Sequence, residues 1–236
     1  MKTLKYLLIL SLVCITSSCY NNQNSLTSYG NRQMIINQNN LNGTVRLDTL
    51  LSKKHNYAIG PVEGLQGEVT VYDDEVSIST VKNGRPKVND SKHTKAIFLL
   101  KANQANWQKM EITENLNGLD AIEGYVQNAL SKNGMDTEKA YPFRIETTPK
   151  FLEYHIIFKM DDAPHNMKEH KKAKQKFILE NEEIKIIGFW VNTERMGKLT
   201  HPGKRTHLHF IKADGGTSGH IDDISISRGA ILFLPK

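Results

Sequence analysis

The sequence contains only two cysteines, Cys14 and Cys19, and both lie close to its N-terminus. A domain formed by the later residues therefore has no disulfide, no catalytic thiol and no thiolate for a metal. The chain also lacks any internal repeat or coiled-coil heptad, and its 39% hydrophobic and 24% charged residues are typical of an ordinary globular protein.

A strong charge of one sign is also missing. The formal net charge is +6, and Lys2 and Lys5, which contribute to it, belong to a predicted leader. The basic residues concentrate between positions 168 and 176, where polar groups rather than stacking aromatic rings separate them. This pattern is typical of a solvated helix face or loop and argues against a nucleic-acid partner.

The only long apolar run of the chain lies near its N-terminus. It follows two lysines, extends from Tyr6 to Ile15, and ends before the small residues 16–18. These are the three parts of an export signal, and the run is too short to span a bilayer permanently. Cys19 follows directly, in a context that resembles a bacterial lipoprotein cleavage site. Residues 1–19 are thus predicted to export the protein and to leave a lipid anchor on Cys19, at the periplasmic or cell-surface side of a bacterial membrane; ordinary cleavage nearby stays open.

The composition then divides the chain into three further parts. Residues 20–42 are rich in Asn, Gln, Ser, Thr and Gly, which predicts a polar linker. Residues 43–160 combine strand-like runs with one amphipathic helical stripe at 117–130, which indicates an N-terminal α/β domain. Residues 161–236 are expected to form a C-terminal, β-rich, metal-binding domain.

Three of the nine histidines lie between positions 207 and 220. Side chains alternate between the two faces of a strand, so His207 and His209 project from one face while Leu208 and Phe210 project from the other. A loop rich in Gly and Asp then reverses the chain, and a second β-like run pairs antiparallel with the first, which brings His220 toward the pair. Three neutral imidazoles that leave one coordination position open predict a catalytic zinc site.

Candidates outside this hairpin are individually weaker. Glu68 shares a strand face with Thr70 and Tyr72. Its spacing alone favours an edge or surface carboxylate over one that faces the histidines. Arg144 has apolar neighbours on both sides and by itself resembles an ordinary exposed arginine. His201, in the loop before the hairpin, is a reserve ligand.

Taken together, these segments resemble the α-acetolactate decarboxylase family, zinc enzymes of bacterial butanediol metabolism. The resemblance is most specific in the hairpin, where the family has a His-Leu-His-Phe-Ile block, a Gly-rich turn and a Gly-Gly-His; Ser218 stands for the first of those glycines. Further blocks agree in order along the chain, and they are Leu65-Gln66-Gly67-Glu68, Phe143-Arg144-Ile145-Glu146 and Ile187-Gly188-Phe189-Trp190. The resemblance extends from about Gly43 to the C-terminus.

The resemblance implies roles for five residues. His207, His209 and His220 would hold Zn²⁺, Glu68 would be the active-site carboxylate, and Arg144 would bind the substrate. The implied fold is α/β, with two sheet-based domains, a mixed sheet and an antiparallel sheet, few helices, and the metal in the cleft between them. The implied reaction is decarboxylation of acetolactate, or of a similar 2-hydroxy-3-keto acid, to acetoin and CO₂.

Other functions stay open at this point. One is an exported metal- or ligand-binding lipoprotein that keeps the scaffold without decarboxylase turnover. Another is a different zinc lyase or hydrolase that uses the same histidines. The expected partner is a small-molecule acid, and the sequence leaves both a monomer and a homodimer open.

Overall fold

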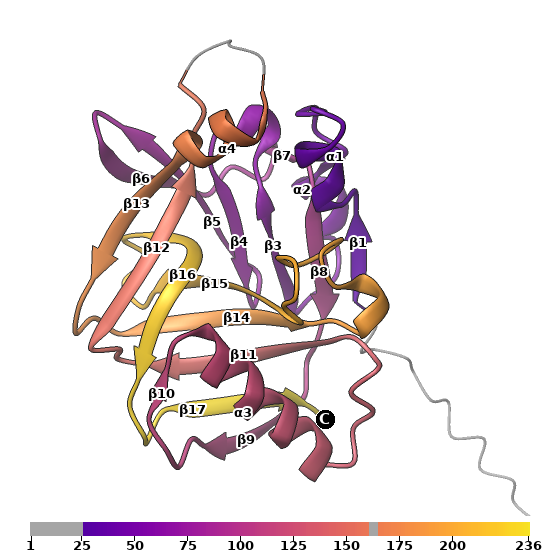
Figure 1. The fold of residues 1–236 in the computed structure, drawn as a ribbon, viewed down its shortest axis with the longest axis vertical. Coiled ribbons are helices and arrows are strands. Elements are labelled where there is room, and N and C mark those ends of the chain that lie inside the picture. Colours follow the sequence, from indigo (N-terminus) through magenta and orange to yellow (C-terminus); the bar gives the residue numbers. More distant parts are fainter. Residues whose placement is uncertain (1–25, 161–164) are drawn as a thin grey trace, which may run out of the picture.

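The computed structural model describes residues 26–160 and 165–236 (Figure 1). The predicted export signal and Cys19 lie outside the described residues. Within them, two large antiparallel sheets form most of the molecule. No helix of this part is long and apolar enough to cross a membrane.

The first sheet has six strands in the order β1-β8-β3-β4-β5-β6. Their bounds, in that order, are Thr27–Tyr29, Leu99–Asn103, Asn56–Pro61, Glu68–Tyr72, Glu75–Lys82 and Arg85–Asn89. A separate two-stranded sheet pairs β2 (Val45–Arg46) with β7 (Lys95–Ala96). Strands β4 and β5 form a hairpin around the Asp73-Asp74 turn.

The second sheet has nine strands, with the path β13-β12-β16-β15-β14-β11-β17-β9 and with β10 paired to β16. In path order their bounds are Lys174–Leu179, Phe151–Ile157, Ser218–Ile226, Thr206–Lys212, Ile184–Trp190, Tyr141–Thr147, Ile231–Pro235 and Trp107–Glu111, and β10 is Leu116–Asn117. This sheet contains strands from both sides of the expected domain boundary at 160/161. The boundary therefore does not separate one sheet from the other.

The helices are few and short, apart from one. They are α1 (Arg32–Ile36), α2 (Leu47–Leu50), α3 (Leu119–Lys132) and α4 (Met167–Ala173), with 3₁₀ turns η1 (Glu63–Leu65) and η2 (Thr193–Arg195). The predicted sheet-based fold with few helices is confirmed. All strand pairings of the described residues are antiparallel, where one mixed sheet was expected. Parallel pairing needs a long crossover, usually helical, and most of these strands are joined by short turns instead.

Helix α3 covers the outer face of the nine-stranded sheet (Figure 1). Its buried stripe consists of Ile122, Val126, Ala129 and Leu130, as the periodicity predicted. The helix ends where the Asn133 side chain donates to the Ala129 carbonyl and Gly134 adopts φ +69°. The opposite face of that sheet packs on the six-stranded sheet, so a second core forms between the two sheets.

The expected linker is partly folded. Residues 27–29 pair with β8 as strand β1, and Leu26 and Ile35 are buried. The Asn31 side chain caps α1 by accepting from the Met34 amide. Part of the predicted polar linker, from residue 26 on, is therefore packed against the fold, because a sheet edge supplies the backbone hydrogen bonds and a few apolar residues suffice to anchor the segment.

Gly188, in β14, lies against the side chains of the two neighbouring strands. A Cβ at this position would lie 2.3 Å from the Phe143 ring and 2.6 Å from Leu208. Gly188→Ala is therefore expected to lower the free energy of unfolding by about 1–3 kcal/mol through overpacking, measured by urea denaturation. Gly124→Ala in α3 is the matched control, since its Cβ would meet no atom within 4 Å, and it should stabilise by about 1 kcal/mol. Equal effects of the two substitutions would contradict this account.

Candidate metal centre

The three hairpin histidines lie together between the two sheets. His207 and His209 come from β15, and His220 lies directly opposite His209 on the adjacent β16. The ring centroids are 5.3 Å apart for His207 and His209, 5.0 Å for His207 and His220, and 5.4 Å for His209 and His220. Leu208 and Phe210 point to the other core, beneath α3. The alternation of side chains predicted for this strand is therefore present in the structure. The role of the histidines as metal ligands stays a prediction.

Each imidazole has an oxygen atom near its Nδ1. The Nδ1 of His207 lies 3.1 Å from the Leu199 carbonyl oxygen, and that of His209 lies 3.1 Å from Oγ1 of Thr70. The Nδ1 of His220 lies 3.6 Å from Oδ1 of Asp222, which is beyond hydrogen-bond distance, and it has no hydrogen-bond partner among the described residues. For His207, the Leu199 carbonyl places the proton on Nδ1 and leaves the Nε2 lone pair free, as around metal-bound histidines.

The surroundings keep these rings neutral. Burial is the main cause that lowers the pKa of His207 to about 3 and the pKa values of His209 and His220 well below 6.5. In the described part of the chain, the buried Nε2 of His209 has no hydrogen-bond partner. An orphaned, neutral nitrogen inside a protein is costly without a ligand, so this cluster fits a divalent metal ion such as zinc.

Glu68 joins the cluster from the facing sheet. This β4 carboxyl is 4% exposed, and its two oxygens lie 3.9 Å from Nε2 of His209 and 3.9 Å from Nε2 of His155. It accepts a hydrogen bond of 3.3 Å from the Ile157 amide. Burial raises the pKa of Glu68 to about 8, so the metal-free protein holds this carboxyl protonated at neutral pH. The surface position that its spacing favoured is wrong, because Glu68 is buried beside the imidazoles. Its role as the active-site carboxylate stays a prediction.

His155 and Asp222 belong to the same cluster and were missed in the sequence. His155 lies opposite His220 in the β12–β16 pairing, with ring centroids 4.5 Å apart. Its Nδ1 lies 2.8 Å from Oδ1 of Asp222. Ligand atoms of His155, His220 and Asp222 all lie within 4.8 Å of one another, and among the described residues this is the one group of three whose ligand atoms lie that close together.

The sequence contained a signal for only one of these two residues. Asp222 follows His220 by two positions and so shares its strand face. His155 is a lone histidine in its strand, and only the strand pairing brings it to the site. The reserve candidate His201 also approaches, with its ring centroid 5.3 Å from that of His220.

Arg144 lies elsewhere on the interface between the sheets. In the register of the nine-stranded sheet it is opposite Ile187, which in turn is opposite His209, so Arg144 and His209 are two strands, or about 10 Å, apart. Its guanidinium carbon lies between 4.3 and 5.9 Å from four aromatic ring centroids, and Nη1 donates to the Tyr57 hydroxyl at 3.1 Å. The four rings belong to Tyr57, Tyr72, Trp107 and Phe233.

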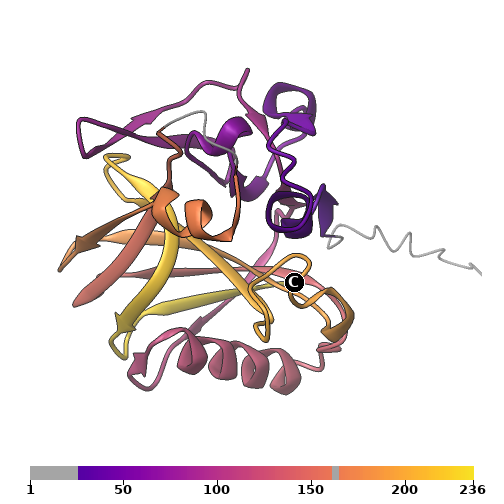
Figure 2. The same ribbon diagram turned by 45° about the horizontal axis from the view of Figure 1, so that its top comes forward.

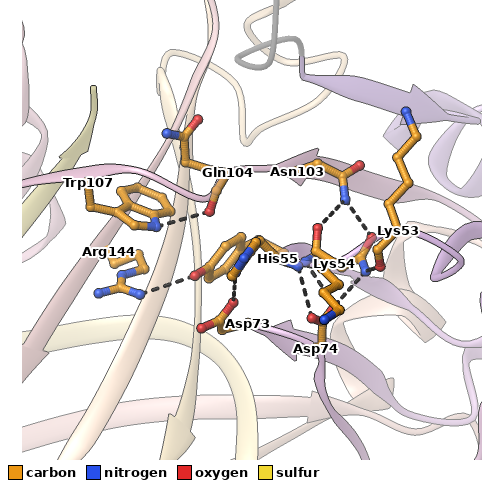
Figure 3. A network of polar contacts seen from close by, with 11 residues as sticks. Lys53, Lys54, His55, Asp73, Asp74, Asn103, Gln104, Trp107 and Arg144 are labelled. Atoms are coloured by element: carbon orange, nitrogen blue, oxygen red, sulfur yellow. Dashed lines mark hydrogen bonds and ion pairs between the residues drawn. The ribbon is translucent and has the colours of Figure 1, made fainter.

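Figure 3 shows Arg144 beside Trp107, in a polar network that continues to Gln104 through the Trp107 indole N–H. None of the three histidines contacts Arg144. Its predicted substrate contact stays a prediction, and its observed contacts make it a link between the sheets.

Comparisons with known proteins show the family and the fold of this chain. The model of the family described as Alpha-acetolactate decarboxylase matches residues 23–234. The crystal structure of alpha-acetolactate decarboxylase from Bacillus subtilis strain 168 has a TM-score of 0.73 at 17% identity, covering 89% of this chain and 85% of that chain. A Staphylococcus aureus protein of unknown function, described as similar to alpha-acetolactate decarboxylase, has a TM-score of 0.70 at 14% identity, with coverages of 89% and 85%. No curated protein sequence matches.

At these identities the solved structures establish a shared fold, which is the fold predicted from the resemblance. The family match carries the classification, because it spans nearly the whole chain from the N-terminal strand to the last strand of the nine-stranded sheet. This chain therefore belongs to the alpha-acetolactate decarboxylase family and is a carboxy-lyase of that type.

Proposed function

We propose that this protein decarboxylates acetolactate, or a similar 2-hydroxy-3-keto acid, to acetoin and CO₂ with a zinc ion held by His207, His209 and His220. The observation that supports this most is the cluster of three buried, neutral imidazoles, in which the Leu199 carbonyl accepts from Nδ1 of His207 and the Nε2 of His209 has no hydrogen-bond partner among the described residues. Three nitrogen ligands leave coordination positions for a substrate, as in catalytic zinc sites.

The reaction makes two demands on the site. Loss of CO₂ leaves the bonding electron pair on the α-carbon, delocalised onto the ketone oxygen, and this carbon must then receive a proton. A bound zinc ion supplies Lewis acidity toward the ketone and hydroxyl oxygens. The protein residues must orient the acid and deliver the proton.

Glu68 is the proposed proton donor. Its carboxyl is buried beside the imidazoles, and burial holds its proton at neutral pH in the metal-free protein. The Ile157 amide and the 3.9 Å approach of His155 fix the position of Oε1. Since the His155 ring is itself held by Asp222 at 2.8 Å, these residues orient Glu68 toward the imidazoles.

The test combines metal analysis with product detection. Purified protein should contain about one zinc ion per chain, lose it to a chelator, and regain it from zinc salts. The zinc-loaded protein should convert acetolactate to acetoin, detected by its colour reaction, and the chelated protein should not. Stoichiometric zinc without acetoin would contradict the decarboxylase proposal and favour a metal-binding protein without turnover.

A further inference from the structure

Lys174 lies next to the cluster on the nine-stranded sheet. It is the first residue of β13 and directly follows α4. In the β12–β13 pairing it lies opposite Ile157, whose amide binds Glu68. Residues opposite each other in an antiparallel pair share a face, so Lys174 is on the face that carries His155 and Ile157.

The ammonium group of Lys174 has no partner in the described part of the structure, although the side chain is only partly exposed. Its neighbour on the same face, Lys176, differs in this respect, since its Nζ donates to Glu153 at 2.5 Å. A partly buried cation without a direct ion pair or hydrogen bond loses hydration that only the more distant carboxyl groups of the cluster offset. Lys174 is therefore placed to accept an anionic ligand.

The pKa shifts of Lys174 and of the histidines agree with a position of Lys174 next to the cluster. Burial is the main cause that lowers the pKa of Lys174, while Asp222 and Glu68 raise it. In turn, the charge of Lys174 contributes to the lowered pKa values of His155, His207 and His201, after burial and other effects. The charge of Lys174 thus lowers the pKa values of histidines from three different segments of the chain.

Arg32 adds a second positive charge at this end of the molecule. It begins α1, its backbone N–H donates to the Lys198 carbonyl in the loop that leads to His201, and its charge also acts on His201. Figure 2, with this end brought forward, shows α1 in indigo and α4 in orange on the same side of the two sheets. Cations therefore face the histidine cluster from two separate segments.

A 2-hydroxy-3-keto acid has a carboxylate that neither the neutral imidazoles nor Glu68 can neutralise, and Arg144 is engaged with its aromatic rings. On the basis of the proposed function, we propose that Lys174 binds the carboxylate of the substrate and so selects 2-hydroxy acids over their uncharged analogues. Charge-assisted hydrogen bonds of this kind are the strong ones in protein sites.

The course of the reaction predicts whether loss of this contact changes KM or kcat. The carboxylate loses its charge as CO₂ departs, so Lys174 stabilises the bound acid at least as much as the transition state. Its removal should therefore raise KM and leave kcat nearly unchanged. A group needed for proton transfer would lower kcat instead.

The experiment compares Lys174→Met with Lys176→Met in zinc-loaded protein. Binding of 2-hydroxy-2-methylpropanoate and of its uncharged amide is measured by calorimetry. Lys174→Met should weaken binding of the acid by about 10-fold or more and leave the amide unaffected, whereas Lys176→Met should change neither. Lys174→Arg should restore binding of the acid. With acetolactate, Lys174→Met should show the corresponding rise in KM.

The outcomes separate this inference from the proposed function. Selective loss of acid binding in Lys174→Met supports the carboxylate contact, even if the wild-type protein forms no acetoin. Unchanged binding of the acid, or equal loss for acid and amide, would overturn it, even if the wild-type protein is an active decarboxylase.

Discussion

Replacing His209 by alanine is expected to abolish stoichiometric zinc binding. This residue is fully buried, and its Nε2 has no hydrogen-bond partner in the described structure while its Nδ1 faces Thr70. Loss of an outer partner of a metal ligand costs about 10–100-fold in affinity, so loss of a ligand itself should exceed about 100-fold. Equilibrium dialysis against zinc, with metal content read by emission spectroscopy, measures the effect.

His93→Ala is the matched control. The His93 side chain is 83% exposed and contacts Asp48 and Arg46 at the surface. It should bind zinc as the wild-type protein does. Full zinc content in His209→Ala, on protein with wild-type circular dichroism, would show that the ion lies elsewhere, and the grouping of His155, His220 and Asp222 would then be the next candidate.

Glu68→Gln is expected to lower kcat by about 100-fold or more and to retain zinc. A positioned proton donor contributes about 10²–10⁴-fold, and glutamine keeps the shape and the acceptor oxygen while it removes the transferable proton. Steady-state acetoin formation, with metal content measured on the same samples, checks this. Glu75→Gln, on the neighbouring strand of the same hairpin and paired with Lys185 at the surface, should keep wild-type turnover.

The pH dependence of stability tests whether Glu68→Gln leaves the fold intact. In metal-free protein the folded pKa of Glu68 is raised to about 8 from an ordinary value of 4.5. The folded state then binds this proton more tightly than the unfolded state, so the free energy of unfolding falls as pH rises from 4.5 toward 8. A glutamine side chain does not titrate, so the Glu68→Gln variant does not lose free energy of unfolding in this way. It should be at least as stable as the wild-type protein at pH 8. A misfolded variant, or wild-type turnover in a folded one, would contradict the assignment.

The histidine hairpin could be predicted from sequence because its information is local. Alternation separates His207 and His209 from Leu208 and Phe210, and a Gly-rich loop of the right length returns the chain to His220. The helical stripe of α3 is local in the same sense. Period and turn chemistry are properties of neighbouring residues, so they can be read without knowledge of the tertiary structure.

The rest of the site depends on pairings between segments far apart in the chain. His155 reaches His220 only because β12 lies beside β16, and Glu68 reaches His209 only because the two sheets pack face to face. No local pattern specifies either contact. Most neighbours of Arg144 also come from distant segments: aromatic rings from four strands surround it, together with Glu146 of its own strand, and the substrate contact that the family motif indicated stays a prediction.

Polar contacts between the sheets occur at several points along their interface. Thr70 meets His209, Ser77 meets Ser218 at 2.8 Å, and Tyr72 donates to Glu146 at 3.0 Å beside Arg144. Thr70, Ser77 and Tyr72 come from the β4–β5 hairpin, and the partners come from the opposite sheet. A one-residue slip of this hairpin would reverse its faces and withdraw all three contacts together with Glu68. Correct registration of one hairpin is therefore a single assembly step that completes the candidate metal centre and joins the two sheets at the same time.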